Sequence, residues 1–305
     1  MARGRSALRG AGKSPDPGGA DALQLHRAGW RGALLLVQPA VGARGRRDMT
    51  VAPANGPRLL QITDTHLFAD PAAEHAGVVP EARLRAVTAA MQPWLASAEA
   101  VVHTGDLVHD GAVVAYERLR GILEAFGRPV RVMPGNHDVR QPLQSVFAGE
   151  AVNAGRTLSV GDWTLISLDS LQVGEVPGRL GADELAALDA ALAGLATRWC
   201  LIALHHPPLP VGTPWLDAIG LAEPEALLER IAADPRVRGV ICGHVHTAFD
   251  GRLRDRRMLT TPATAAQFLA GAPRFTTVPA APGFRWLDLC ADGGIDTGVV
   301  RVPMA

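Results

Sequence analysis

The sequence predicts an α/β fold, and three observations indicate it. Short apolar runs recur along the chain and end in polar clusters, as buried strands do. Amphipathic segments lie between several of these runs, and strands that alternate with helices are typical of an α/β architecture. The chain has 305 residues, of which 48% are hydrophobic, so it is long enough to bury a sizeable core.

The alternating part of the chain contains six expected strands and four expected helices. The strands are Arg58–Ile62, Ala100–His103, Val130–Met133, Trp163–Leu168, Trp199–Leu204 and Val237–Cys242. In Glu81–Leu95, Leu84, Val87 and Met91 lie on one helical face with Leu95. The same spacing predicts helices at Val113–Phe126, Ala182–Leu195 and Glu223–Ala233.

The last part of the chain has a different pattern. Three apolar runs follow one another without long helices between them, which indicates a second sheet. These runs are Arg257–Thr261, Phe284–Cys290 and Ile295–Val302.

The first residues differ from the rest in composition. Residues 1–56 are rich in Gly, Ala, Arg and Pro and have no sustained period, which argues against a packed element. Met49 directly precedes the first strand-like run and is a plausible start of translation. We expect residues 1–56 to be an extension that is disordered or not translated, and residues 57–305 to form one domain. Residues 1–48 should be dispensable.

Charge and cysteine content exclude several classes of protein. Residues 1–48 carry nine Arg or Lys against three Asp, so the remainder has a net charge of −6 in a chain whose total is zero. An acidic body gives no indication of a nucleic-acid partner. No apolar stretch reaches the roughly 20 residues of a membrane span, and Gly32–Gly42 is too short and too polar for a signal peptide. Three widely spaced cysteines favour a reducing compartment, so we expect a cytoplasmic protein.

Polar clusters follow five of the expected strands. The clusters are Thr63-Asp64-Thr65-His66, Gly105-Asp106, Gly135-Asn136-His137-Asp138, His205-His206-Pro207-Pro208 and Gly243-His244-Val245-His246. In open α/β sheets, ligands bind outside the carboxyl ends of the strands, so these clusters should converge. Each cluster alone has an ordinary explanation, such as a turn at Gly-Asp. Five in succession, each after a strand, favour a shared site.

The residue types in these clusters indicate a pair of metal ions. Carboxylate and amide oxygens together with imidazole nitrogens, without thiolate, suit zinc, iron or manganese rather than calcium. Seven such residues are too many for one ion, and a carboxylate can bridge two ions roughly 3.5–4 Å apart. Of His205 and His206, we expect one ligand and one packed histidine.

With these motifs the chain resembles the calcineurin-like metallophosphoesterase family, and within it the bacterial class III 3′,5′-cyclic-nucleotide phosphodiesterases. The family motifs are Asp-x-His, Gly-Asp, Gly-Asn-His-Asp, His and Gly-His-x-His, in this order. The narrower resemblance is carried by Leu60–Phe68, Leu209–Asp217, Ile241–His246, Pro262–Phe268 and Ala281–Leu289. Together these matches extend over about residues 57–302.

The resemblance implies that residues 57–305 form an αββα sandwich of two mixed β-sheets flanked by helices. It also implies that this domain binds two metal ions. It implies that one ion is held by Asp64, His66, Asp106 and His246. It implies that the other is held by Asp106, Asn136, His205 and His244, so that Asp106 bridges. The ions would be iron or manganese, with zinc as the alternative. Asn136 and His137 would bind the phosphate, and His137 and Asp106 would be catalytic.

One position departs from the family pattern. Many members have an Asp three residues after the bridging Asp, where it orients the catalytic histidine, but here that position is His109. Asp110 or Asp138 could orient His137 instead, and the sequence does not choose between them. We interpret His103 and His109 as structural.

The function implied is hydrolysis of 3′,5′-cyclic AMP to 5′-AMP by attack of a hydroxide that bridges the two metals. One alternative is a phosphodiesterase of broader specificity that takes glycerophosphodiesters, 2′,3′-cyclic nucleotides or nucleic acid. Another is a non-catalytic sensor of cyclic nucleotides, whose signature would be a lost ligand, and none is lost here. The partner is a small-molecule substrate, and the oligomeric state stays open.

Overall fold

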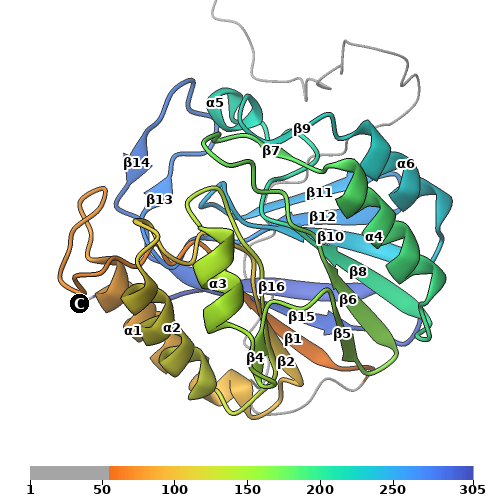
Figure 1. The fold of residues 1–305 in the computed structure, drawn as a ribbon, viewed down its shortest axis with the longest axis horizontal. Helices are drawn as coiled ribbons and strands as arrows, with labels where there is room; N and C mark the ends of the chain where they lie inside the picture. The colour runs from red at the N-terminus through yellow and green to blue at the C-terminus, as the bar shows by residue number, and fades with distance from the viewer. Residues whose placement is uncertain (1–54, 305) are drawn as a thin grey trace, which may run out of the picture.

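A computed structural model describes residues 55–304 and arranges them in four layers. Two six-stranded sheets pack face to face, and helices cover the outer face of each sheet (Figure 1). Both sheets combine parallel and antiparallel pairs. The predicted αββα sandwich of two mixed sheets is therefore confirmed. The expected extension, residues 1–56, lies almost entirely outside the described residues.

The first sheet contains four successive parallel strands and two that join through antiparallel pairs. Arg58–Ile62 pairs with the second strand in register from Leu59 with Ala100 to Ile62 with His103. The strand order is β16 (Ile295–Arg301), β15 (Gly283–Leu289), β1 (Arg58–Ile62), β2 (Ala100–His103), β3 (Val130–Val132) and β4 (Val152–Asn153).

The second sheet has a parallel centre and an antiparallel strand at each edge. Its order is β11 (Phe249–Leu253), β12 (Arg256–Thr260), β10 (Val237–Cys242), β8 (Trp199–Ala203), β6 (Trp163–Ser167) and β5 (Thr157–Val160). Two strand pairs lie outside the large sheets: β7 (Gly178–Arg179) with β9 (Leu221–Ala222), and β13 (Gln267–Phe268) with β14 (Thr277–Val278).

The apolar side chains of the strands alternate between two environments. In β1, Leu60 and Ile62 belong to the core under the helices, while Leu59 belongs to the core between the sheets. Such alternation follows from the two-residue period of a strand. The helices are α1 (Pro80–Leu95), α2 (Val113–Glu124) and α3 (Arg140–Val146) on the first sheet, α4 (Ala182–Ala193) and α6 (Glu225–Ala233) on the second, and the short α5 (Pro214–Asp217). None of them is long and apolar enough for a bilayer crossing.

The assignment of strands to sheets corrects one expectation. The three last runs were expected to form a second sheet, but β15 and β16 extend the first sheet through antiparallel pairing of β15 with β1. Only β12, of the three, lies in the second sheet, together with β6, β8 and β10. Strand pairing is set by contacts between distant residues, and the absence of intervening helices carries no information about them.

Candidate metal centre

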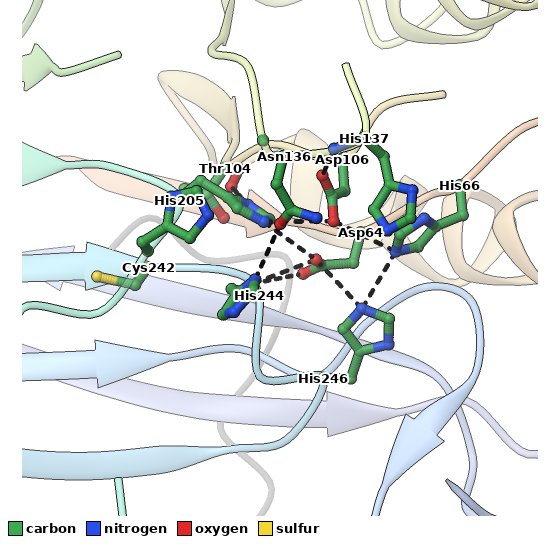
Figure 2. A network of polar contacts seen from close by, with 12 residues as sticks. Asp64, His66, Thr104, Asp106, Asn136, His137, His205, Cys242, His244 and His246 are labelled. Atoms are coloured by element: carbon green, nitrogen blue, oxygen red, sulfur yellow. Dashed lines mark hydrogen bonds and ion pairs between the residues drawn. The ribbon is translucent and has the colours of Figure 1, made fainter. Parts of the chain in front are cut away.

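The predicted site residues lie in loops that follow the carboxyl ends of five strands, three in the first sheet and two in the second. Asp64 and Asp106 lie at the centre of the group, with histidines from both sheets around them (Figure 2). The strands β1, β2 and β3 are parallel, as are β8 and β10, so each sheet presents its loops at one edge. The structure thus brings together Asp64, His66, Asp106, Asn136, His137, His205, His244 and His246.

The first group of donors is the set expected for one metal. The ligand atoms of Asp64, His66, Asp106 and His246 all lie within 4.8 Å of one another, and all four residues are buried. The Nε2 atoms of His66 and His246 are 3.1 Å apart. The Oδ1 atom of Asp64 lies 3.3 Å from His246 Nε2.

His246 uses one ring nitrogen for a hydrogen bond to the backbone and directs the other toward the centre of the group. His246 Nδ1 donates to the carbonyl oxygen of Ala266 at 2.8 Å, as a metal-binding histidine usually does with its second nitrogen. With Nδ1 bonded to Ala266, Nε2 is the nitrogen of His246 that faces the Asp64 carboxylate and Nε2 of His66. A carboxylate oxygen and two imidazole nitrogens are donor types that bind transition metals. The geometry therefore fits a divalent ion.

The second group of donors lies around His205. Its Nδ1 donates to the Thr104 carbonyl oxygen at 2.7 Å, and its Nε2 lies 3.3 Å from Asp106 Oδ2. The Nε2 atoms of His205 and His244 are both buried and have no hydrogen-bond partner among residues 55–304. Asn136 Oδ1 lies 3.1 Å from His244 Nδ1. Nitrogen and oxygen donors of this kind suit iron, manganese or zinc.

Asp106 lies between the two groups. Its Oδ2 atom is 3.6 Å from His66 Nε2 in the first group and 3.3 Å from His205 Nε2 in the second. Burial alone would raise the pKa of Asp106, but His205 outweighs it and holds the pKa well below its usual value. Burial likewise lowers the pKa of His205, but the charge of Asp106 prevails and raises that pKa to about 9. The centre thus strongly favours a positive charge beside Asp106.

His206 has a different environment from its neighbour His205. Its Nδ1 lies 2.8 Å from the hydroxyl oxygen of Ser170, and its Nε2 lies 3.0 Å from the carbonyl oxygen of Val176. Both nitrogens of His206 are therefore occupied by neutral groups outside the centre, whereas Nε2 of His205 faces the carboxylate of Asp106. These contacts favour His205 over His206 as the ligand, although the nitrogens of His205, His206 and His244 lie within 4.8 Å of one another.

The structure gives both candidate orienting carboxylates other partners. Asp138 is buried and accepts hydrogen bonds from the amides of Leu107, Val108 and Gly135 and from the hydroxyl of Tyr116, at 2.8–3.1 Å. Asp110 is exposed and accepts from the amides of Ala69 and Ala112. No side chain among residues 55–304 accepts a hydrogen bond from the His137 ring. That ring instead stacks on His109, with centroids 4.4 Å apart.

His109 has a contact that the sequence does not reveal. Its Nδ1 lies 3.2 Å from Nδ1 of His66, the nitrogen of His66 that points away from His246. His109 thus lies where it can hydrogen-bond the outer nitrogen of His66 and fix the orientation of that ring, as partners of metal-binding histidines do. The structural interpretation of His109 is incomplete for this reason. The ring of His103, by contrast, hydrogen-bonds to the Thr65 hydroxyl, at 3.1 Å, within the core.

The backbone at the site is strained. Eight non-glycine residues of the described chain have a left-handed φ, and five of them are candidate ligands: Asp64, His66, Asp106, His244 and His246. Such conformations cost of order 1–3 kcal/mol each and gather at functional sites. Close approach also requires Gly135, since a Cβ atom there would lie 2.2 Å from Asp106 Oδ1.

We expect Asp138→Ala to destabilise the protein by about 3–5 kcal/mol, because it leaves four donors without their buried acceptor. Burial and the charge of Asp106 raise the pKa of Asp138 to about 7, against the effect of these donors. Urea unfolding measures the loss. The matched control is Asp110→Ala, which removes an exposed carboxylate and should cost about 1 kcal/mol. Equal losses would mean that Asp138 has no special structural role.

Comparison with known proteins identifies the family. Residues 57–248 match the family model described as calcineurin-like phosphoesterase. The chain belongs to the calcineurin-like phosphoesterase family. It is therefore a phosphoesterase, as the motifs predict. It is 36% identical over 257 residues to a protein of Pseudomonas aeruginosa named 3′,5′-cyclic adenosine monophosphate phosphodiesterase CpdA, covering 84% of this chain and 94% of that protein.

A second curated relative and a solved structure are also similar to this phosphoesterase. The CpdA protein of Escherichia coli strain K12 is 36% identical, with 80% of this chain and 90% of that protein covered. Among solved structures, a dimetal phosphatase from Danio rerio has a TM-score of 0.59 at 17% identity, and the match covers 82% of this chain and all of that chain. At this identity the structural match shows that the fold is shared.

Proposed function

We propose that this phosphoesterase hydrolyses 3′,5′-cyclic AMP to 5′-AMP and uses two divalent cations. The similarity to relatives named as cyclic AMP phosphodiesterases, which extends over at least 90% of their length, supports the substrate most directly. The two groups of donors around Asp106 support the pair of metals.

In this proposal the seven donors divide as the family resemblance implies. Asp64, His66 and His246 hold one ion, and Asn136, His205 and His244 hold the other, with Asp106 shared between them. Two bound cations would lower the pKa of a coordinated water and offset charge on the phosphoryl oxygens. The donor set suits iron or manganese, with zinc as the alternative.

The protein itself positions the phosphate and the leaving group. Asn136 and His137 are only partly buried, unlike the other donors, so they form the rim that a substrate meets. The amide of His137 donates to Asp106 Oδ1 at 2.9 Å, which fixes the backbone of this loop against the centre. From this position His137 can bind a phosphoryl oxygen and donate a proton to the departing 3′ oxygen.

A comparison of specificity constants tests the proposed substrate. With the manganese-loaded full-length protein, kcat/KM for 3′,5′-cyclic AMP should exceed the values for 2′,3′-cyclic AMP and glycerophosphodiesters by at least about tenfold, or about 1.4 kcal/mol in transition-state binding. Chelation should abolish the activity, and metal should restore it. Faster turnover of glycerophosphodiesters would establish the broader specificity instead. Tight binding of cyclic AMP without turnover would identify a sensor.

A further inference from the structure

Three aromatic side chains form a cluster that has no role in the chemistry described so far. Trp215 lies in α5, Phe268 lies in β13, and Phe275 lies in the loop between β13 and β14. Their ring centroids are 5.2–5.4 Å apart in each pair, with interplanar angles of 66–72°. Edge-to-face rings at this spacing attract one another. We call these three residues the aromatic cluster.

The aromatic cluster begins directly at the metal centre. The Phe268 ring stacks on the ring of His246, with centroids 4.0 Å apart and an interplanar angle of 8°. Ala266, two residues before Phe268, accepts the hydrogen bond from His246 Nδ1. The cluster is therefore attached to a candidate ligand through both a ring contact and the backbone.

Two segments that are distant in the sequence hold the cluster in place. The amide of Gly271, beyond β13, donates to the hydroxyl oxygen of Thr213 at 2.9 Å, directly before α5. The amide of Leu269 donates to the carbonyl oxygen of Thr276 at 2.9 Å within the hairpin. Figure 1 shows β13, β14 and α5 at the same end of the molecule. Hydrogen bonds therefore connect the segments that carry the aromatic rings.

The outer side of the cluster faces solvent. Phe275 is 58% exposed, although it adjoins two other aromatic rings. The indole Nε1 of Trp215 is buried and has no hydrogen-bond partner among the residues that the structure describes, which is unfavourable for a self-contained core. An accessible aromatic surface beside a phosphate site suits a planar, partly apolar ligand group.

We infer that the aromatic cluster is a stacking platform for the nucleobase of a cyclic nucleotide whose phosphate lies at the metal centre. This inference rests on the proposed function, since the same site takes the phosphodiester. In a cyclic nucleotide the ribose separates base and phosphate, so the base lies beside the phosphate-binding residues, as the cluster does. Stacking of one base on an aromatic side chain changes affinity by about 5- to 150-fold and depends little on which base is present.

Phe275→Ala tests the platform without touching a candidate metal ligand. We expect kcat/KM for cyclic AMP to fall about 5- to 150-fold. The value for methyl ribofuranoside 3′,5′-cyclic phosphate, which has the same cyclic phosphate and no base, should stay within about twofold. Phe275→Trp should restore the value for cyclic AMP. Leu269→Ala is the matched control, because it removes an exposed apolar side chain from the same hairpin without removing a ring.

A binding measurement separates the platform from the proposed reaction. Calorimetry on the manganese-loaded full-length protein should show that Phe275→Ala weakens the binding of 5′-AMP by about 5- to 150-fold. The affinity for ribose 5-phosphate, which has no base, should be unchanged. Equal weakening of both ligands, or of neither, would overturn the platform and make the cluster a support of His246. If cyclic AMP is not hydrolysed but the effect on 5′-AMP is seen, the platform stands and only the proposed reaction fails.

Discussion

Replacing Asp106 by alanine should release both metal ions and lower kcat by at least about 10³-fold. The reason is geometric: Oδ2 of Asp106 lies 3.6 Å from His66 Nε2 in one donor group and 3.3 Å from His205 Nε2 in the other. Replacing a residue that belongs to only one donor group should release only the ion bound by that group. Elemental analysis of the manganese-loaded variant measures the ions bound per chain.

The control for this variant is Asp110→Ala, four residues further on. Asp110 is exposed and its carboxylate accepts only backbone amides, so the control should keep both ions and nearly full turnover. A melting curve of each variant shows whether the fold survives. If Asp106→Ala still holds two ions per chain, the shared position assigned to Asp106 is wrong.

Replacing His137 by alanine should lower turnover of cyclic AMP by about 10²–10⁴-fold and leave the metal content unchanged. The 3′ alkoxide of the sugar is a poor leaving group that needs a proton, whereas a nitrophenolate needs almost none. The same variant should therefore lose less than about tenfold on bis(p-nitrophenyl) phosphate. Parallel assays of the two substrates measure this difference.

The environment of His137 makes the comparison informative. Its ring packs on His109 and against the edge of His66, so its removal leaves Asp64, Asp106 and His246 in place. Equal losses on both substrates would indicate that His137 binds phosphate and does not donate the proton. Loss of metal would place His137 among the ligands, which the cluster of His66, His109 and His137 nitrogens also allows.

Local patterns in the sequence were sufficient to predict the main elements. The bounds of β1, β2 and β10 agree with the expected strands, and α1, α2 and α4 differ by no more than two residues at either end. These elements are long enough to show an apolar period. The hairpin β13–β14 has strands of only two residues, which is too short for any period, so the sequence does not predict it.

The site could be predicted for a related reason. Five polar clusters follow five strands, and the rule that strand ends gather ligands places them together without knowledge of strand pairing. What could not be predicted depends on contacts across the fold. The partners of Asp138, the approach of His109 to His66 and the left-handed backbone at Asp64 all arise from neighbouring loops. No local pattern encodes which loop adjoins which.

The division of the donors between the two sheets has a thermodynamic consequence. Asp64, His66, Asp106 and Asn136 follow strands of the first sheet, while His205, His244 and His246 follow strands of the second. Ions bound between them would tie the two halves of the sandwich to each other. By mass action, an ion that binds only the folded state raises the free energy of unfolding by about 4 kcal/mol when the free ion is at roughly a thousand times its Kd. The availability of metal in the surroundings would thus set the fraction of chains that are folded as well as their activity.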